Sequence, residues 1–219
     1  MTAAPRARSP RWEALRGEQE AAVAAAIIAV VAEDPSGLSV AEVAQRAGIS
    51  RQTFYKQFTS LEAAVAVTQQ RVVTDLGRRI AEDLASGPPP TDGLERLLRI
   101  FEASFEIFAA DPATLRFTSF YDFSFRVHRM SAADREEHPL APPADGEGGM
   151  HDLLRAGQLD GSIDPSLPVE TTWRALSTSM LGVIQRLQIQ DDWTDGRDSA
   201  ARATYAAMIA VWKKTLASS

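Results

Sequence analysis

Residues 38–58 read Leu-Ser-Val-Ala-Glu-Val-Ala-Gln-Arg-Ala-Gly-Ile-Ser-Arg-Gln-Thr-Phe-Tyr-Lys-Gln-Phe, and this stretch decides the fold. Ser39 and Glu42 have the spacing of a capping box, in which a serine hydroxyl and a glutamate carboxylate accept amide hydrogens at a helix start. A first helix should therefore begin near Val40. Gly48 should end it, because glycine adopts the left-handed conformation of a helix cap at little steric cost.

A second short helix is expected at 51–57, with Ser50 as its N-cap. Phe54 and Phe58 lie one helical turn apart, so both should point inward and leave the neighbouring side chains exposed. Two short helices joined by a tight turn predict a helix-turn-helix. In such a motif the early residues of the second helix enter the major groove, where arginine and glutamine can pair with guanine and adenine edges.

The segment 37–58 resembles the N-terminal DNA-binding domain of TetR-family transcriptional regulators, through Ala-Gly-Ile-Ser at 47–50 and Thr-Phe-Tyr-Lys-Gln-Phe at 53–58. The resemblance implies a regulator that binds a double-stranded DNA operator. It also implies which side chains touch phosphates and which approach bases. The predicted DNA-binding residues are Ser39, Tyr55 and Lys56 for phosphates, Arg51, Gln52 and Thr53 for bases, and Arg46 and Ser50 beside them.

One position departs from the family pattern. Family members typically open the next helix with a lysine that touches a phosphate, and this chain has Leu61 there. Thr59 and Glu62 still have capping-box spacing at this point. The departure leaves an alternative open: an adaptor or oligomerisation protein of the same fold with lost or weak DNA binding.

The composition bounds the class of protein. A chain of 219 residues with 45% hydrophobic content can form one large or two small domains with a sizeable core. Cysteine is absent, so there is no disulfide scaffold and no thiol chemistry. No apolar run reaches the roughly 18 residues of a membrane span, and the N-terminus lacks the pattern of a secretion signal. We therefore expect a cytoplasmic protein with no membrane contact.

Motifs of catalytic chemistry are missing from the sequence. It contains no Gly-rich phosphate loop, no G-x-S-x-G elbow, no H-E-x-x-H and no cysteine nucleophile. We do not expect an enzyme, and no motif calls for a cofactor. His138 and His151 flank an acidic stretch, but two histidines without cysteine or a convergent acidic cluster do not predict a metal site.

The net charge of −6 is unevenly distributed along the chain. Residues 1–60 carry seven Lys and Arg against six Asp and Glu, whereas the remainder carries 16 against 23. The acidic charge therefore lies away from the predicted DNA-binding motif. Arg6 and Arg8 belong to an N-terminal arm, for which two interpretations stay open: contact with phosphates or the minor groove, and a solubilising tail.

The rest of the sequence predicts an all-α fold, because helical spacing recurs almost throughout and no strand-like alternation appears. We expect an N-terminal arm and three-helix helix-turn-helix domain at 1–60, then a helical effector-binding and dimerisation domain at 61–219. A helix at 61–85 should connect the two. A mobile loop is expected at 131–149. The other expected helices are 12–33, Leu94 to Asp111, 113–129, 168–190 and 198–217.

Phenylalanines concentrate in the two helices on either side of Asp111-Pro112, and the spacing suggests that they meet in one region. An ordinary aromatic core and an apolar cavity for a small, flat or greasy effector both fit this pattern. The family resemblance favours the cavity. The candidate effector-binding residues are Phe101, Phe105, Phe108, Phe117, Phe120, Tyr121, Phe125, His128 and Trp173.

Each of the last two helices carries two packing faces. A stripe of large apolar residues runs beside a stripe of small ones, such as Ala175 and Gly182 in helix 168–190 and Ala203 and Ala207 in helix 198–217. Burial of both faces within one chain is possible. The family resemblance favours a homodimer through these helices. So does DNA recognition, because paired half-sites require two helix-turn-helix motifs. The sequence thus predicts a homodimeric regulator, a repressor that a largely apolar effector releases from its operator.

Overall fold

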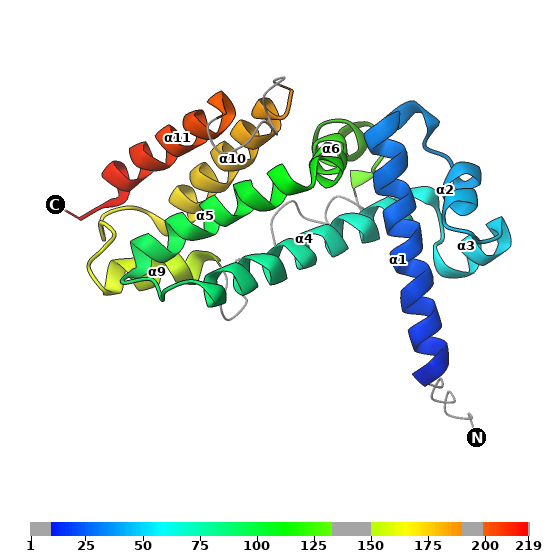
Figure 1. Cartoon of the computed structure of the whole chain (residues 1–219), viewed down its shortest axis with the longest axis horizontal. Coiled ribbons are helices and arrows are strands. Elements are labelled where there is room, and N and C mark those ends of the chain that lie inside the picture. The colour runs from blue at the N-terminus through cyan, green and yellow to red at the C-terminus, as the bar shows by residue number, and fades with distance from the viewer. Residues whose placement is uncertain (1–9, 133–149, 190–198, 219) are drawn as a thin grey trace. The chain divides into compact units, whose positions relative to one another are not determined.

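The computed structural model describes residues 10–132, 150–189 and 199–218 (Figure 1). Over these residues the chain is helical, without a strand and with one isolated antiparallel bridge between Ile163 and Ala217. The all-α prediction is confirmed. The helices are α1 (Pro10–Glu33), a 3-10 turn (Pro35–Gly37), α2 (Val40–Arg46), α3 (Arg51–Gln57), α4 (Leu61–Ser86), α5 (Gly93–Ala110), α6 (Pro112–Phe120), a π-helical turn (Tyr121–Phe125), α7 (Arg126–His128), α9 (Met150–Leu159), α10 (Val169–Leu187) and α11 (Ala200–Leu216).

The chain forms two compact units. The first contains the described residues up to Val72 together with 116–132, and the second contains 73–115 and the described residues from Met150 onward. This division lies within α4 and differs from the expected boundary at residue 60. The reason is chemical: aromatic side chains between Phe117 and Phe125 fill the core that surrounds α1 and the start of α4, so this later segment belongs with the helix-turn-helix.

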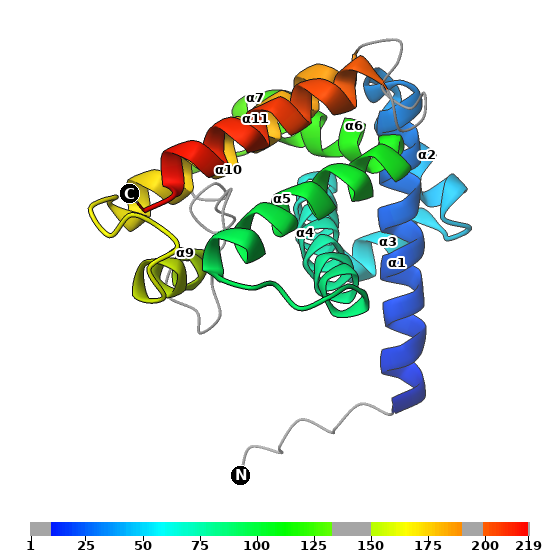
Figure 2. The ribbon, with the colours of Figure 1, turned by 60° about the vertical axis from the view of Figure 1, so that its left-hand side comes forward.

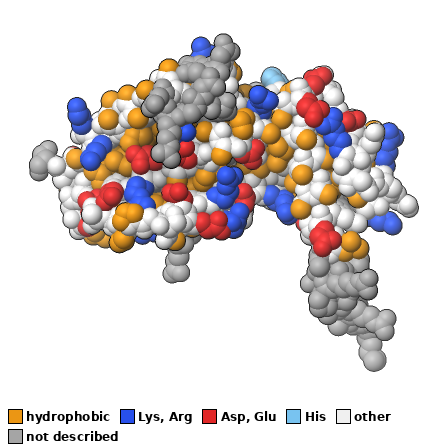
Figure 3. Space-filling model, in the orientation of Figure 1, with side chains coloured by type: hydrophobic (Ala, Val, Ile, Leu, Met, Phe, Trp, Pro, Cys, Tyr) orange, Lys and Arg blue, Asp and Glu red, His pale blue; other side chains and the backbone are white. Residues whose placement is uncertain are grey.

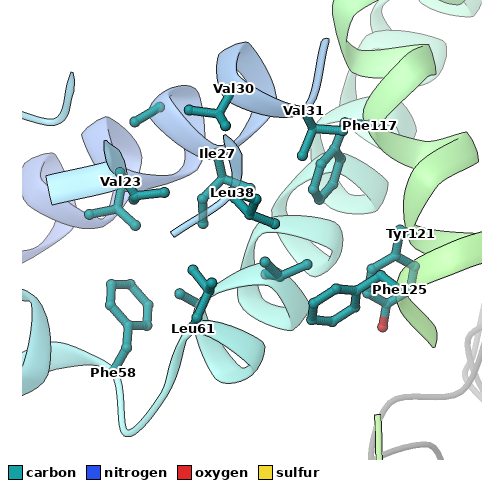
Figure 4. Close-up of a cluster of buried hydrophobic side chains, with 14 of the residues drawn as sticks. Val23, Ile27, Val30, Val31, Leu38, Phe58, Leu61, Phe117, Tyr121 and Phe125 are labelled. Atoms are coloured by element: carbon teal, nitrogen blue, oxygen red, sulfur yellow. The ribbon is translucent and has the colours of Figure 1, made fainter. Parts of the chain in front are cut away.

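The core of the first unit is built around α1. Val23, Ile27 and Val30 are buried in it at helical spacing, and Phe58 and other side chains complete it from the neighbouring helices (Figure 4). Burial of this much apolar surface is what stabilises such short helices, since a seven-residue helix is not stable by itself in water. The helix-turn-helix is therefore held in shape mainly by its core.

The segment from α6 through the π-helical turn supplies a row of aromatic rings to this same core. Phe117, Tyr121 and Phe125 are almost fully buried, with ring centroids 6.4 Å apart for the first pair and 5.9 Å for the second. Figure 4 shows Phe117 beside Val31 of α1, with Tyr121 and Phe125 next to each other. The expected helix 113–129 is therefore continuous in outline but changes to π-helical geometry at Tyr121–Phe125.

The second unit has its own core between α5, α9, α10 and α11. Phe101, Phe105 and Phe108 line the buried face of α5, and α10 and α11 lie side by side over it (Figure 2). The buried Tyr205 hydroxyl donates to the Phe101 carbonyl at 2.8 Å, so this polar group is satisfied inside the core. Among the helices that the structure describes, none is both long and apolar enough to cross a membrane.

Several sequence-based expectations concern residues outside the described part of the chain. They are the arginines of the N-terminal arm, His138, and residues 133–149 of the expected loop. Within the described residues, no three His, Asp or Glu side chains gather as metal ligands.

Candidate nucleic-acid interface

The start of α2 has half of the expected capping box. Ser39 is the N-cap, and its hydroxyl oxygen accepts a hydrogen bond from the Glu42 amide at 3.3 Å. The Glu42 carboxylate accepts from the Nε of Arg46 at 2.6 Å, one turn further along the helix. The serine half fixes the helix start at Val40, as predicted, and the glutamate is used in an ion pair.

The turn between α2 and α3 has the geometry that only glycine adopts easily. Gly48 has φ +67°, and its amide donates to the carbonyl of Gln45 at 3.2 Å while the Ile49 amide donates to that of Ala44 at 3.0 Å. These two bonds form a Schellman motif, which ends a helix by satisfying its last carbonyls. The predicted role of Gly48 is confirmed.

The orientation of α3 follows from its two ends and its buried face. Ser50 caps the helix, with its hydroxyl oxygen accepting from the Thr53 amide at 3.0 Å. Phe54 and Phe58 are buried, and their ring centroids lie 5.3 Å apart. This anchoring leaves Arg51, Gln52, Tyr55 and Lys56 exposed on the opposite side of the helix. Figure 3 shows blue, cationic side chains on the surface over α2 and α3.

The predicted DNA-binding residues lie close together but differ in availability. Tyr55 keeps 57% of its surface accessible. The exposed residues among them are Ser39, Ser50, Arg51, Gln52, Tyr55 and Lys56. The Thr53 hydroxyl lies 2.9 Å from that of Ser50, so these two share a hydrogen bond. Arg46 differs, because its guanidinium is occupied by carboxylates of Glu33 and Glu42.

The start of α4 corrects one expectation. Its cap is Ser60, whose hydroxyl accepts from the Ala63 amide at 3.0 Å, so Thr59 and Glu62 do not form a capping box. Glu62 pairs with Arg129 at 3.2 Å. Leu61, at the position where the family has a lysine, is 8% exposed and packs in the core of the first unit (Figure 4).

The candidate effector-binding residues do not form one cluster, so the expectation of a single aromatic region is wrong. Spacing could not reveal the division, because α6 starts a new direction after Asp111, whose carboxylate caps it by accepting from the Thr114 amide at 3.1 Å. His128 is exposed at the end of α7. Phe117, Phe120, Tyr121 and Phe125 belong to the core of the first unit, and Phe101, Phe105, Phe108 and Trp173 to that of the second.

Two aromatic residues of α11, Tyr205 and Trp212, join the second cluster, although neither was a candidate effector-binding residue. Trp173 stacks on Phe101 with centroids 6.0 Å apart, and Trp212 meets the same ring edge-on at 5.0 Å. Tyr205 lies against Phe105 at 4.5 Å, and burial raises the pKa of its phenol well above the ordinary value. The phenol therefore stays protonated, as its hydrogen bond to Phe101 requires. Tyr205, Ile209 and Trp212 follow one another at helical spacing, and this was the signal that could have placed the two aromatic residues of α11 in the cluster.

An exposed recognition helix on a helix-turn-helix, linked to a second helical unit, defines a DNA-binding regulatory protein. Residues 22–70 match the sequence profile described as bacterial regulatory proteins, tetR family. The chain thus carries the DNA-binding domain of the tetR family. A comparison with curated protein sequences finds no match.

Solved structures of regulatory proteins share the fold of the whole chain. The fatty acid degradation regulator FadR from Bacillus halodurans is 18% identical with a TM-score of 0.69, covering 90% of this chain and 98% of its own. A TetR family transcription regulator from Marinobacter aquaeolei VT8 is 20% identical, with a TM-score of 0.66 over 94% and 100% of the two chains. The ketosteroid transcriptional regulator KstR2 of Mycobacterium tuberculosis is 21% identical, with a TM-score of 0.56 over 99% of each chain.

Proposed function

We propose that this protein is a homodimeric transcriptional repressor that binds its operator through α3 and is released by a largely apolar small molecule. The observation that carries the proposal is the recognition face of α3. Arg51 and Gln52 are exposed in its first turn, the part of a recognition helix that reaches base edges. They are the proposed base-reading residues, with Thr53 beside them.

Phosphate contacts are proposed for the side chains around this face. Lys56 offers an exposed cation and Tyr55 an exposed phenol in the second half of α3. Ser39 accepts a backbone amide through its oxygen, which leaves its hydroxyl hydrogen able to turn toward another acceptor. The Ser50 and Thr53 hydroxyls share one hydrogen bond, so one of their two hydrogens is left for another acceptor. Such contacts would fix the position of α3 on the duplex without reading sequence.

The homodimer is proposed from the exposed small residues of α10 and α11. Large side chains such as Leu176, Ile184 and Tyr205 face the core of the second unit, whereas Ala175 and Gly182 lie exposed on α10. On α11 the exposed small residues are Ala203, Ala207 and Ala210. Small residues let helices of a second copy approach closely, and two copies would present two recognition helices to half-sites about 34–36 Å apart.

The effector is proposed to bind in the second unit, against the aromatic cluster around Phe101, Phe105, Phe108 and Trp173. Aromatic and apolar linings are typical of small-molecule sites. Two of the similar structures bear names that concern ketosteroids and fatty acid degradation, which favours an apolar compound. The aromatic residues from Phe117 to Phe125 are not proposed to bind the effector. They complete the core of the first unit, which contains the helix-turn-helix, and are proposed to transmit the effect of the ligand to it.

The release step needs a ligand that favours one conformation over another, since a ligand with equal affinity for both shifts nothing. The chain passes between the two units three times: within α4, between Leu115 and Arg116, and after Ala132. The passage within α4 or the one at Leu115 can carry a displacement of the second unit to the helix-turn-helix. Release from the operator, and with it the end of repression, follows if the displaced recognition helices no longer match successive major grooves.

The experiment that tests this function is selection of duplex DNA from a random library by the full-length protein. We expect enrichment of an inverted repeat, with half-sites about one helical turn apart or a multiple of it. Fatty acids and steroids added to the purified complex should then be screened for release of the DNA. If no sequence were enriched, the adaptor alternative suggested by Leu61 would replace the repressor.

A further inference from the structure

Arg46 holds two carboxylates from two different helices. Its Nη1 and Nη2 donate to the two carboxylate oxygens of Glu33, at 2.9 and 2.8 Å. Its Nε donates to Glu42 at 2.6 Å. The pair with Glu33 is a two-point, fork-like contact, which fixes orientation as well as distance.

The two carboxylates place this network at a structural junction. Glu33 is the last residue of α1, and Arg46 is the last residue of α2. The chain between the helices is the 3-10 turn Pro35–Gly37 and the cap at Ser39. The network therefore ties the C-terminal ends of α1 and α2 together on the surface, while Val30 and Val43 join them in the core.

The charge of the network argues against a phosphate contact. One guanidinium and two carboxylates sum to −1, so the local field repels a DNA phosphate. The hydrogen bonds from Arg46 also lower the pKa of Glu33, so this carboxylate stays ionised at neutral pH. A phosphate that recruited Arg46 would have to displace an equally charged partner and leave Glu33 unpaired beside the DNA.

We infer that Arg46 is a positioning residue, which braces α2 against α1 and so sets the direction of α3, and that it does not neutralise a phosphate. The inference rests on the proposed DNA-binding function and replaces the direct contact first expected of Arg46. Ion pairs on a surface contribute little to global stability. Loss of the network should therefore make α2 and α3 less rigidly positioned and should lower DNA affinity, with little effect on the stability of the whole fold.

A charge exchange separates bracing from contact. Arg46→Glu places three carboxylates together and should weaken binding to the selected operator by about tenfold, since both subunits of the dimer lose the network. Adding Glu33→Arg to the same chain recreates the pair with its charges reversed, and should recover most of the affinity. A glutamate in place of a phosphate-binding arginine would remain repelled by DNA, so persistent weakness of the double variant would overturn the inference.

The salt dependence of binding gives a second, independent readout. Arg46→Gln should leave the slope of log K against log salt unchanged. A lost phosphate contact would reduce the slope by about 0.9 in each subunit, or about 1.8 in the dimer. Lys56→Gln is the matched control, for which this reduction is expected. A reduction of the same size for Arg46→Gln would assign Arg46 to the phosphates.

Hydrogen exchange in the free protein tests the bracing without DNA. In Arg46→Gln the amides of α2 and α3 should exchange faster than in the wild type, and the exchanged pair Glu33→Arg with Arg46→Glu should restore their protection. Unchanged exchange in Arg46→Gln would overturn the inference. A protein that enriches no DNA but shows the faster exchange would contradict the proposed function while leaving the brace in place.

Discussion

Gly93, the first residue of α5, lies directly against Gly157 of α9. A Cβ built on Gly93 would be 2.4 Å from the Cα of Gly157, a separation that real side chains do not reach. A Cβ on Gly157 would in turn meet the Ile163 side chain at 2.5 Å. Both glycines are therefore required by close packing and not by backbone conformation, since neither has a positive φ.

The Gly93→Ala and Gly157→Ala variants should each lose stability, by about 1–3 kcal/mol, as expected for overpacking in a well-packed region. The larger loss is expected for Gly93→Ala, because its obstacle is backbone. Gly77→Ala is the control: this position lies within α4 with open space around it, and alanine there should stabilise the protein by about 0.5–1 kcal/mol. Urea denaturation measures all three, and equal stabilities for Gly93→Ala and the wild type would contradict the packing argument.

The same junction predicts a pH dependence. The Asp160 carboxylate accepts hydrogen bonds from Ser162 and from the Gly93 amide at 2.7 Å, and these bonds hold the pKa of Asp160 below its ordinary value. A carboxylate with a lowered folded-state pKa stabilises the fold above its unfolded pKa of about 3.9, and the stabilisation disappears as pH falls through the folded value.

The stability difference between the wild type and Asp160→Ala should therefore be constant from pH 7 to pH 5 and should shrink below about pH 4. Urea denaturation across this range measures it. Asp160→Asn is the control, because its amide oxygen can accept one bond but does not titrate. A difference between wild type and Asp160→Ala that grew toward acid pH would contradict the assignment.

A matched pair of phenylalanines can test whether residues 116–132 belong to the first unit, which contains the helix-turn-helix. Phe125 is fully buried in the core with α1 and α4, whereas Phe123, two residues earlier, is 67% exposed. Phe125→Ala should cost about 3–5 kcal/mol, and Phe123→Ala should stay within about 0.5 kcal/mol of the wild type. Hydrogen exchange should locate the loss from Phe125→Ala in α1 and α4. If the hydrogen-exchange protection of α1 and α4 did not change, residues 116–132 would not belong to the first unit.

Local signals in the sequence were sufficient for the helix-turn-helix. Ser39, Gly48 and Ser50 act through bonds to residues three to five positions away, so their spacing alone predicts α2, the turn and α3. The burial of one face of α1 was predictable for the same reason, because a helix brings residues three and four positions apart onto one face.

Contacts between distant segments could not be predicted in this way. Which core receives Phe117 depends on the direction that α6 takes after Asp111, and spacing within a helix does not encode that direction. The partners of Arg46 show the same limit, since Glu33 is 13 positions away and becomes a neighbour only when α1 and α2 pack together. The π-helical geometry at Tyr121–Phe125 left no recognisable mark in the residue pattern.

The recognition face predicts two kinds of variant. Arg51→Ala and Gln52→Ala should change which operator bases are preferred, because a good bidentate contact discriminates by about 1–3 kcal/mol. Tyr55→Phe and Lys56→Ala should weaken binding to all sequences more evenly. Repeating the DNA selection with each variant distinguishes the two effects. Unaltered base preferences in both Arg51→Ala and Gln52→Ala would remove these residues from base reading.

The proposed dimer face can be tested at the centre of α11. Ala207 is exposed and points away from the core that holds Tyr205 and Ile209, so Ala207→Arg should leave the fold of each chain intact. In a dimer that buries this face, two arginines would enter the contact without partners, and burying an unpaired charge is costly. Sedimentation should therefore show monomers, and operator affinity should fall steeply because a single reading unit remains.

Ala81→Arg is the control for this experiment, since it adds the same charge to an exposed position of α4. It should sediment as the wild type does. If Ala207→Arg also sedimented as a dimer with unchanged operator affinity, the small residues of α11 would not form the subunit contact. Circular dichroism of both variants guards against unfolding, because loss of helix would be visible in the far ultraviolet and would explain a loss of binding by itself.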